Sequence, residues 1–196
     1  MAWAKAGTTT LGSASSPPLT LSGITASKFI QVMIHTLDAG STLAPRMAIT
    51  DAGSGTNHSN RASKNGAADA TNVSRYDWLT NATENASDQF QVAYICNITG
   101  EEKLAIINCC DESAAGAGND PERREGVGKY SDGGSEAQFT RIDIISSITN
   151  NYDTGSNISA LGSDGVESMK VQDGAVYYET DTNKEYVLYD NTWTEL

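Results

Sequence analysis

The apolar residues of this chain come in short segments that alternate residue by residue with polar ones, and this pattern constrains the fold most strongly. Gly, Asn, Asp, Ser and Pro separate the segments. Alternation with a period of two places successive side chains on opposite faces of a β-strand, whereas an amphipathic helix needs a period near 3.6. No segment longer than ten residues combines helical spacing with helix caps. The sequence therefore predicts an all-β protein, a jelly-roll-like antiparallel β-sandwich.

The clearest predicted strand covers residues 28–37. Ile30, Val32 and Ile34 share one face of this strand, opposite more polar positions, so we expect these three side chains in the core. The same reasoning applies to residues 88–99, where the set expected in the core is Phe90, Val92, Tyr94, Cys96 and Ile98. The other predicted strands are 19–24, 45–50, 75–79, 103–110, 127–130, 138–148 and 157–161.

Two long polar stretches interrupt this pattern. Residues 51–74 and 111–125 contain almost no large apolar side chain, so both are expected to be loops. Structureless loops longer than about 12 to 15 residues are uncommon inside a compact domain and are often functional. The alternative is a solvated crossover between strands, which a jelly roll needs for topological reasons alone.

Length and charge limit the classes of partner. A chain of 196 residues is long enough for one domain with a small appendage. Its 13 Lys and Arg against 25 Asp and Glu give a formal charge of −12, which repels phosphate backbones and anionic bilayers. Nucleic acid and membrane are therefore not expected as partners. The N-terminal residues lack the apolar region of a signal peptide, so synthesis in the cytoplasm is expected.

The last 26 residues differ from the rest in their aromatic content. The chain has eight Tyr and three Trp, and five of these lie in residues 171–196. Three short alternating segments with minimal turns predict a three-stranded β-meander there. Because such a small sheet cannot bury a core alone, it is expected to serve as an attachment or oligomerisation element. The sandwich is expected to occupy residues 1–165, with residues 156–165 as the passage between the two parts.

An interface between subunits is expected to use strand faces of the sandwich together with this meander. Tyr and Trp tolerate partly wet interfaces because each has a large apolar ring and a polar group. The candidate interface residues are Met33, Arg141, Tyr177, Tyr178, Tyr186, Tyr189 and Trp193.

The three cysteines are expected to be reduced. A turn at residues 99–102 would place Cys96 opposite Ala105 and Cys109 opposite Val92, which leaves no pair close enough for a disulfide. All three are interpreted as small buried hydrophobic residues.

No catalytic residue, cofactor or metal ligand is predicted. The two histidines are His35, on a strand face, and His58, in a loop. Their spacing does not suit zinc ligands, and the chain has no Gly-x-Ser-x-Gly motif whose serine either histidine could activate. The segment Asp181-x-Asn183-x-Glu185 imitates the first ligands of a calcium loop, but it lacks the central Gly and distal Glu, so a hairpin turn is the simpler interpretation. A structural Ca²⁺ between loops is left open; the other candidate set is Asp111, Glu112, Asn119 and Asp120.

Several phrases of the sequence resemble the strand segments of virion proteins from tailed bacteriophages and archaeal tailed viruses. The terminal meander, with its Tyr-Tyr-Glu-Thr-Asp-Thr-Asn-Lys-Glu-Tyr run and closing Trp193, resembles a unit that recurs in phage tail and head-appendage proteins. The resemblance implies a non-enzymatic β-sandwich on the particle surface, usually trimeric, that serves as decoration, fibre or attachment module. The other phrases are 1–3 with 8–11, 24–32, 101–106, 115–123, 127–129 and 152–162.

Two functions from different classes are therefore expected. The first is a viral structural protein in the virion, with copies of itself, other virion proteins and a host surface glycan as partners. The alternative is a carbohydrate-binding or adhesive module that acts outside a virion. Its candidate stacking residues are Tyr76, Trp78, Tyr130 and Trp193. The position on head, collar or tail does not follow from the sequence.

Overall fold

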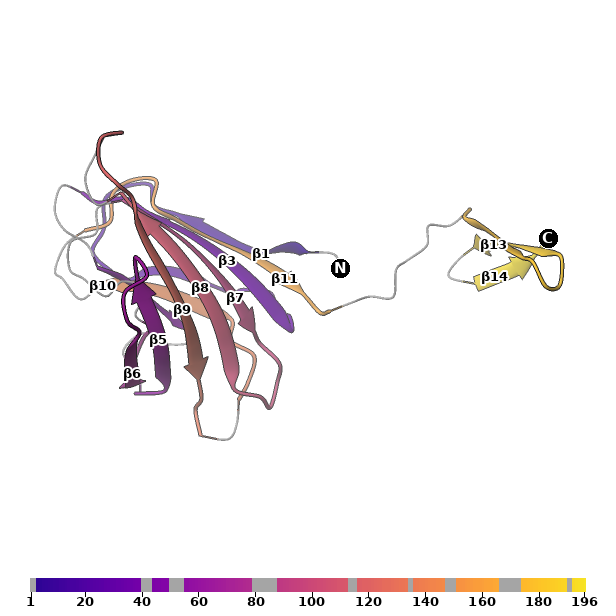
Figure 1. Ribbon diagram of the computed structural model, residues 1–196, viewed down its shortest axis with the longest axis horizontal. Coiled ribbons are helices and arrows are strands. Elements are labelled where there is room, and N and C mark those ends of the chain that lie inside the picture. The colour runs from indigo at the N-terminus through magenta and orange to yellow at the C-terminus, as the bar shows by residue number, and fades with distance from the viewer. Residues whose placement is uncertain are drawn as a thin grey trace. The chain divides into compact units, whose positions relative to one another are not determined.

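The protein is described by a computed structural model that covers residues 3–39, 44–49, 55–78, 88–112, 116–133, 136–146, 151–165, 174–189 and 192–196 (Figure 1). Within these ranges every regular secondary-structure element is a β-strand. The strands are β1 (Ala4–Thr10), β2 (Leu19–Ser22), β3 (Phe29–Thr36), β4 (Pro45–Ile49), β5 (His58–Lys64), β6 (Ala70–Arg75), β7 (Gln89–Cys96), β8 (Lys103–Asp111), β9 (Glu122–Tyr130), β10 (Arg141–Ser146), β11 (Asn157–Ser163), β12 (Val176–Glu179), β13 (Lys184–Tyr189) and β14 (Thr192–Glu195).

Residues Trp3–Asp164 form one compact unit that contains two antiparallel sheets. The larger sheet has eight strands in the order β1-β11-β3-β7-β8-β9-β5-β6, and the smaller has three in the order β2-β10-β4. Inward side chains of both sheets join a single hydrophobic cluster, so the two sheets form the layers of a sandwich. The predicted all-β antiparallel β-sandwich is confirmed, with sheets of very unequal size.

The core lies between the small sheet and the middle of the large one. Ile30, Val32 and Ile34 of β3 are buried there, as their alternation predicts. From the small sheet, Ile142 and Ile144 of β10 meet them in the same cluster. Each fully buried Ile or Val stabilises the fold by about 1.5 to 3 kcal/mol relative to exposure. This central layer fixes which face of the large sheet points to solvent.

The prediction for residues 88–99 has the right strand but the wrong face. In β7 the small residue Ala93 and Ile95 point into the core, together with two glutamines, while Phe90 and Tyr94 point outward. The bulkier set of side chains was expected inside because apolar area favours burial. Here Ala93 and Ile95 of β7 share the cluster between the sheets with the β3 and β10 isoleucines, and the bulky set lies on the opposite face.

The register between β7 and β8 accounts for this reversal. Cys96 pairs with Leu104 and Ile95 with Ala105, one residue away from the predicted pairing of Cys96 with Ala105. A slip of one residue exchanges the two faces of a strand. The connecting turn is held by Lys103, whose buried Nζ donates to the carbonyl oxygens of Ile98 at 2.5 Å, Glu101 at 2.8 Å and Glu136 at 3.3 Å.

The polar stretches are also more ordered than predicted. Residues 55–74 include β5 and most of β6, and the end of the second stretch begins β9. β5 pairs with both β6 and β9, so the backbone ladder supplies the regularity that apolar alternation does not. Of the predicted strand 75–79, residues 76–78 lie outside β6. The predicted strand 157–161 is confirmed as part of β11, which lies between β1 and β3, so the supposed passage at 156–165 is largely a strand of the large sheet.

The second compact unit begins at Gly165 and contains the predicted three-stranded meander. β12, β13 and β14 pair in that order, with Tyr177 opposite Tyr186 and Leu188 opposite Trp193. Positions 171–173, 190 and 191 of the predicted segment lie outside the described residues.

Ending the chain at Ser168 is expected to leave the sandwich folded. All members of the main hydrophobic cluster lie between Ala6 and Ala160, so the truncation removes none of them. The midpoint of thermal unfolding should change by no more than about 2 °C, as measured by circular dichroism. If the truncated chain unfolds at ordinary temperature, the meander contributes to the core and the division of the chain is wrong.

Candidate functional site

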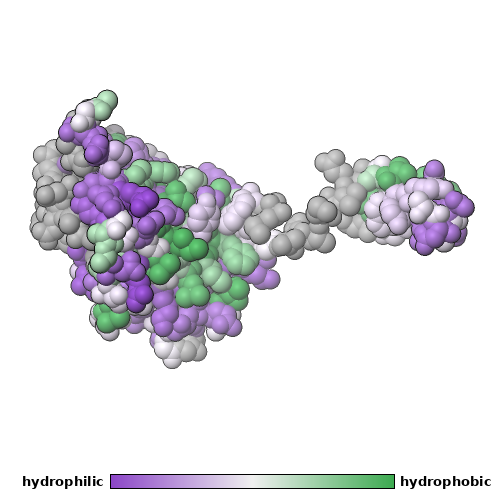
Figure 2. Space-filling model, in the orientation of Figure 1, coloured by the Kyte–Doolittle hydropathy of each residue, from purple (hydrophilic) through white to green (hydrophobic). Residues whose placement is uncertain are grey.

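The outward face of the eight-stranded sheet carries a continuous apolar surface. Phe90, Tyr94, Leu104, Ile106 and Val127 are each between 45% and 58% exposed. The register places Tyr94, Ile106 and Val127 side by side across β7, β8 and β9. We call these five residues the outer patch. Figure 2 shows apolar residues gathered over these strands on the face turned to the viewer.

β8 shows how the sequence could have revealed the outer patch. Leu104 and Ile106 point outward, while Ala105 and Ile107 point into the core. A strand with apolar residues on both faces is typical of a sheet that is covered on both sides. A strand with one solvated face normally has polar residues there. The predicted strand 103–110 carries this signal, because Leu104 and Ile106 alternate with Ala105 and Ile107.

The charges around the outer patch differ in sign from those of the chain as a whole. Among the described outward positions of β3, β5, β7, β8 and β9, three are basic and one is acidic. Arg123 lies 3.7 Å from Glu125, and Lys129 lies 3.3 Å from Glu102. The excess of acidic residues that gives the chain its charge of −12 therefore lies elsewhere. The three basic residues of this face are Arg61, Arg123 and Lys129, and the acidic one is Glu125.

The cysteines occupy three different environments, which corrects the prediction that all are buried. All three are free thiols. Cys109 is buried, and burial raises the pKa of its thiol far above the ordinary range, so it is unreactive at neutral pH. Cys96 is half-buried, and Cys110 is exposed opposite Phe90. Cys110 therefore provides a natural reporter beside the outer patch.

The candidate interface residues of the sandwich lie on different sheets. Met33 is half-buried on the outward face of β3, opposite Val92, and so belongs to the surface that carries the outer patch. Arg141 lies on β10 of the small sheet, where its Nε is 2.9 Å from the carboxylate of Asp143. The structure brings Met33, but not Arg141, into one surface with the outer patch.

The five candidate residues of the meander are divided between its two faces. The cross-strand pairs place Tyr177, Tyr186 and Trp193 on one face. Alternation along the strands then sends Tyr178 and Tyr189 to the other face. On the first face, the centroids of the Tyr177 and Tyr186 rings are 6.2 Å apart, and those of Tyr177 and Trp193 are 6.0 Å apart.

His58 is a buried residue of the core and not a loop residue as predicted. It begins β5, and its ring packs edge-on against Trp78 and Tyr130 at centroid distances of 5.3 and 4.9 Å. The backbone N–H of Ile49 donates to its Nε2 at 3.3 Å, which requires that nitrogen to be unprotonated. Burial lowers the pKa of His58 to about 4, and a weaker opposing effect comes from the Arg75 backbone.

The free energy of unfolding is expected to fall as the pH drops from 7 to 4. In the unfolded chain His58 binds a proton below about pH 6.5, whereas in the folded protein it stays neutral down to about pH 4. Its contribution to stability is therefore complete above pH 6.5, is lost progressively down to pH 4, and amounts to about 3 kcal/mol. Urea unfolding at several pH values measures it. His58→Gln should remove this part of the pH dependence, whereas the control His35→Gln, on the exposed face of β3, should not. If the free energy of unfolding changes equally with pH in the unchanged chain and in both variants, the assignment to His58 is wrong.

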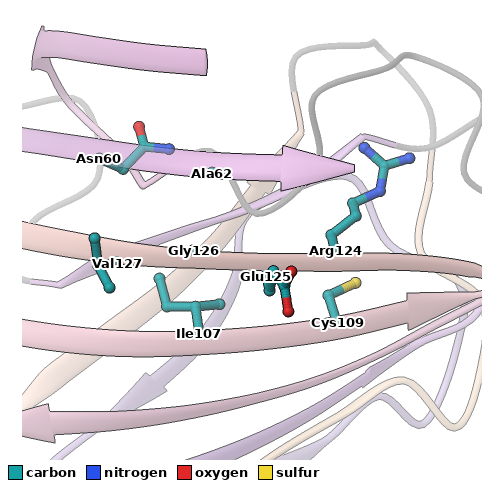
Figure 3. A pocket seen from close by; sticks show the side chains of 8 residues that line it. All are labelled: Asn60, Ala62, Ile107, Cys109, Arg124, Glu125, Gly126 and Val127. Atoms are coloured by element: carbon teal, nitrogen blue, oxygen red, sulfur yellow. The ribbon is translucent and has the colours of Figure 1, made fainter. Parts of the chain in front are cut away.

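Several buried charged side chains of the sandwich form ion pairs within the fold. Arg46 lies 3.7 Å from the fully buried carboxylate of Asp77, whose pKa is raised by burial despite this neighbour. Arg124 binds Asp111 at 3.2 Å and Glu122 at 2.8 Å. Beside Arg124, a narrow pocket lies among β5, β8 and β9 (Figure 3). Its volume of about 10 Å³ has room for roughly one water molecule, so it cannot take a substrate.

The residues considered for calcium do not come together as a site. In the described part of the chain, no group of three or more His, Cys, Asp or Glu side chains is arranged to hold a metal ion. Asp181 and Asn183 lie in the turn between β12 and β13, where Tyr178 donates its hydroxyl hydrogen to Asn183 Oδ1 at 2.8 Å.

Among the described residues, none forms a helix with the length and hydropathy needed to cross a bilayer.

The exposed surfaces described above are thus the features to which a function can be assigned: the outer patch on the sandwich and the aromatic face of the meander. A search of protein-family models, of curated protein sequences and of solved structures finds no match to this chain.

Proposed function

We propose that this protein is a non-enzymatic structural protein that associates with copies of itself to build a larger assembly. The observation that carries this proposal is the outer patch. Monomeric proteins seldom leave a contiguous row of half-exposed Tyr, Ile and Val side chains across the middle strands of a sheet. An apolar row of this kind on the outward face of a sheet is stable in water when a partner covers it.

The area of this surface supports a protein partner. Five large side chains, each about half exposed, present roughly 400 Å² of mainly apolar surface. The half-buried Phe29, Met33, Val92 and Cys96 extend it across β3 and β7. A stable interface buries about 800 Å² on each partner, with an apolar centre and a polar rim. The outer patch would be the centre, and the charged residues of β9 would form part of the rim.

The charge pattern supports a second copy of this chain as the partner. Two chains with a charge of −12 repel each other wherever their acidic surfaces meet. The outward face of the large sheet is locally neutral to basic, because Arg123 and Lys129 lie beside Glu125 and Glu102. Contact through this face therefore brings the copies together with the least repulsion.

A closed cyclic oligomer, with a trimer as the expected number, is the arrangement that repeats one contact without growing indefinitely. The resemblance of the strand phrases and the meander to tailed-virus proteins supports the surface of a virus particle as the location. In that setting the protein would be decoration, fibre or attachment module, with the meander as the attachment element.

The alternative, a carbohydrate-binding module, loses two of its four candidate stacking residues. Trp78 is fully buried and Tyr130 nearly so, so neither can stack on a sugar. Tyr76 is partly exposed, and the guanidinium of Arg75 lies over its ring at 5.6 Å. No stacking surface forms from these residues on the sandwich.

The proposal is tested by the mass of the full chain in solution and by the reactivity of Cys110. Sedimentation velocity between about 1 and 100 µM should show a discrete oligomer, with three times the mass of one chain as the expected value. A maleimide reagent should modify Cys110 more slowly as the oligomer forms, while the buried Cys109 stays unmodified throughout. A stable monomer over this range, or Cys110 equally reactive in the oligomer, contradicts association through the outer patch.

A further inference from the structure

The first face of the meander is hollowed where its aromatic residues meet. The hollow has a volume of about 360 Å³ and is lined by Tyr177, Tyr186, Trp193 and the carboxylate-bearing Glu179. This volume falls in the range of sites for small ligands, about 300 to 1,000 Å³. The ring planes of Tyr177 and Tyr186 are inclined by 34°, and those of Tyr177 and Trp193 by 65°. The rings therefore lie at different angles around the hollow and do not form one flat platform.

The charge at this hollow is negative. Residues 171–196 contain six Asp and Glu and one Lys. Lys184 pairs opposite Glu179 across the strands, and its ammonium lies 2.8 Å from Glu195, which offsets its charge. The Glu179 carboxylate accepts hydrogen bonds from Thr182 at 2.5 Å and from the Tyr186 hydroxyl at 3.4 Å, both neutral groups. Its negative charge is thus held in place at the wall of the hollow.

We infer that this hollow binds a quaternary ammonium group, such as the trimethylammonium head of choline. Such a cation has no hydrogen-bond donor to satisfy, and it is attracted by the negative faces of aromatic rings and by a nearby carboxylate. A trimethylammonium head is also small enough for the volume available. The three rings and Glu179 supply both kinds of attraction in one place.

A sugar is the competing ligand, and the lining of the hollow favours it less. A sugar ring stacks on a single flat aromatic face and carries many hydroxyl groups that need donors and acceptors. Here the described lining consists of three inclined rings and one carboxylate. Its donors are two tyrosine hydroxyls and one indole N–H, and the Tyr186 hydroxyl already donates to Glu179. This inference concerns the meander alone, so it can fail while self-association through the outer patch holds, and the reverse.

The test compares choline with 3,3-dimethylbutan-1-ol, which has the same shape without the charge. With the full-length chain, the indole N–H signal of Trp193 is followed by two-dimensional NMR and identified by its loss in Trp193→Phe. Choline should shift this signal saturably in the millimolar range, and the neutral alcohol should bind at least tenfold more weakly. Methyl glucoside, as the sugar probe, should leave the signal unmoved.

Matched variants separate the carboxylate of the hollow from the general charge of the meander. Glu179→Gln should weaken choline binding about fivefold or more, because it removes the charge and keeps the shape. Glu185→Gln removes one charge from the opposite face and should leave binding unchanged within about twofold. The inference is overturned if the alcohol binds as well as choline, if only the glucoside binds, if no saturable shift occurs up to about 100 mM choline, or if both variants weaken binding equally. Unchanged backbone signals from β12 and β13 show that each variant retains its fold.

Discussion

Ile106→Glu is expected to weaken self-association by at least about 100-fold, because it places a carboxylate at the centre of the outer patch. Ile106 lies between Tyr94 and Val127 in the sheet, and its side chain is 58% exposed in the single chain. In an interface the new carboxylate would be buried without a partner, and burying an unpaired charge is costly. Sedimentation velocity on the full chain measures the change.

The stability of the single chain should be nearly unaffected by this substitution. The Ile106 side chain points away from the core, and substitutions at exposed positions usually change stability by less than about 0.5 kcal/mol. Val73→Glu is the matched control: Val73 is 67% exposed on β6, three strands away from β8, and this variant should associate normally. If both variants associate like the unchanged chain, the outer patch is not the contact surface. If both lose association equally, net charge and not the outer patch decides it.

Trp78→Ala is expected to lower the free energy of unfolding of the sandwich by about 3 to 5 kcal/mol. Trp78 is fully buried, its Nε1 donates to the carbonyl oxygen of Lys129 at 3.0 Å, and its backbone pairs with Met47 of β4. It therefore links the small sheet to β9 of the large sheet. Urea unfolding followed by circular dichroism measures the loss.

Gly128 provides an independent test of the same contact. A Cβ at this position would lie 2.8 Å from atoms of the Trp78 indole, closer than atoms can approach without a shift. Gly128→Ala should destabilise the unchanged chain by about 1 to 3 kcal/mol and should cost much less in the Trp78→Ala background, where the ring is gone. Additive effects of the two substitutions would show that the indole does not pack on Gly128.

Much of the strand layout could be predicted from the sequence, because apolar alternation is a local property. Residues 28–37 were predicted and β3 covers Phe29–Thr36; residues 45–50 were predicted and β4 covers Pro45–Ile49. The three strands of the meander follow from the same kind of pattern. β5 and β6 were missed because Ser, Asn and Ala side chains give no alternation, and backbone pairing with β9 defines these strands.

The candidate site was only partly predictable. The aromatic residues of the meander were identified from their density, and the pairing of Tyr177 with Tyr186 then decided which of them share a face. Two residues of the outer patch, Phe90 and Tyr94, were predicted as core, since a bulky apolar set is ordinarily the buried one. For His58, a polar neighbourhood in the sequence predicted a loop, although the residue packs against Trp78 and Tyr130.

The class of the fold, most of its strands and the aromatic meander follow from local sequence patterns, because they depend on residues near one another in the chain. The buried face of β7, in contrast, is set by contacts between distant segments. That choice depends on a register difference of one residue between β7 and β8, which Lys103 supports by binding three carbonyl oxygens in and near the turn. It depends also on packing with the β3 and β10 side chains, which share one hydrophobic cluster with Ala93 and Ile95 of β7. Because both faces of these strands are apolar, their pattern fits either choice, and the packing of distant segments resolves it.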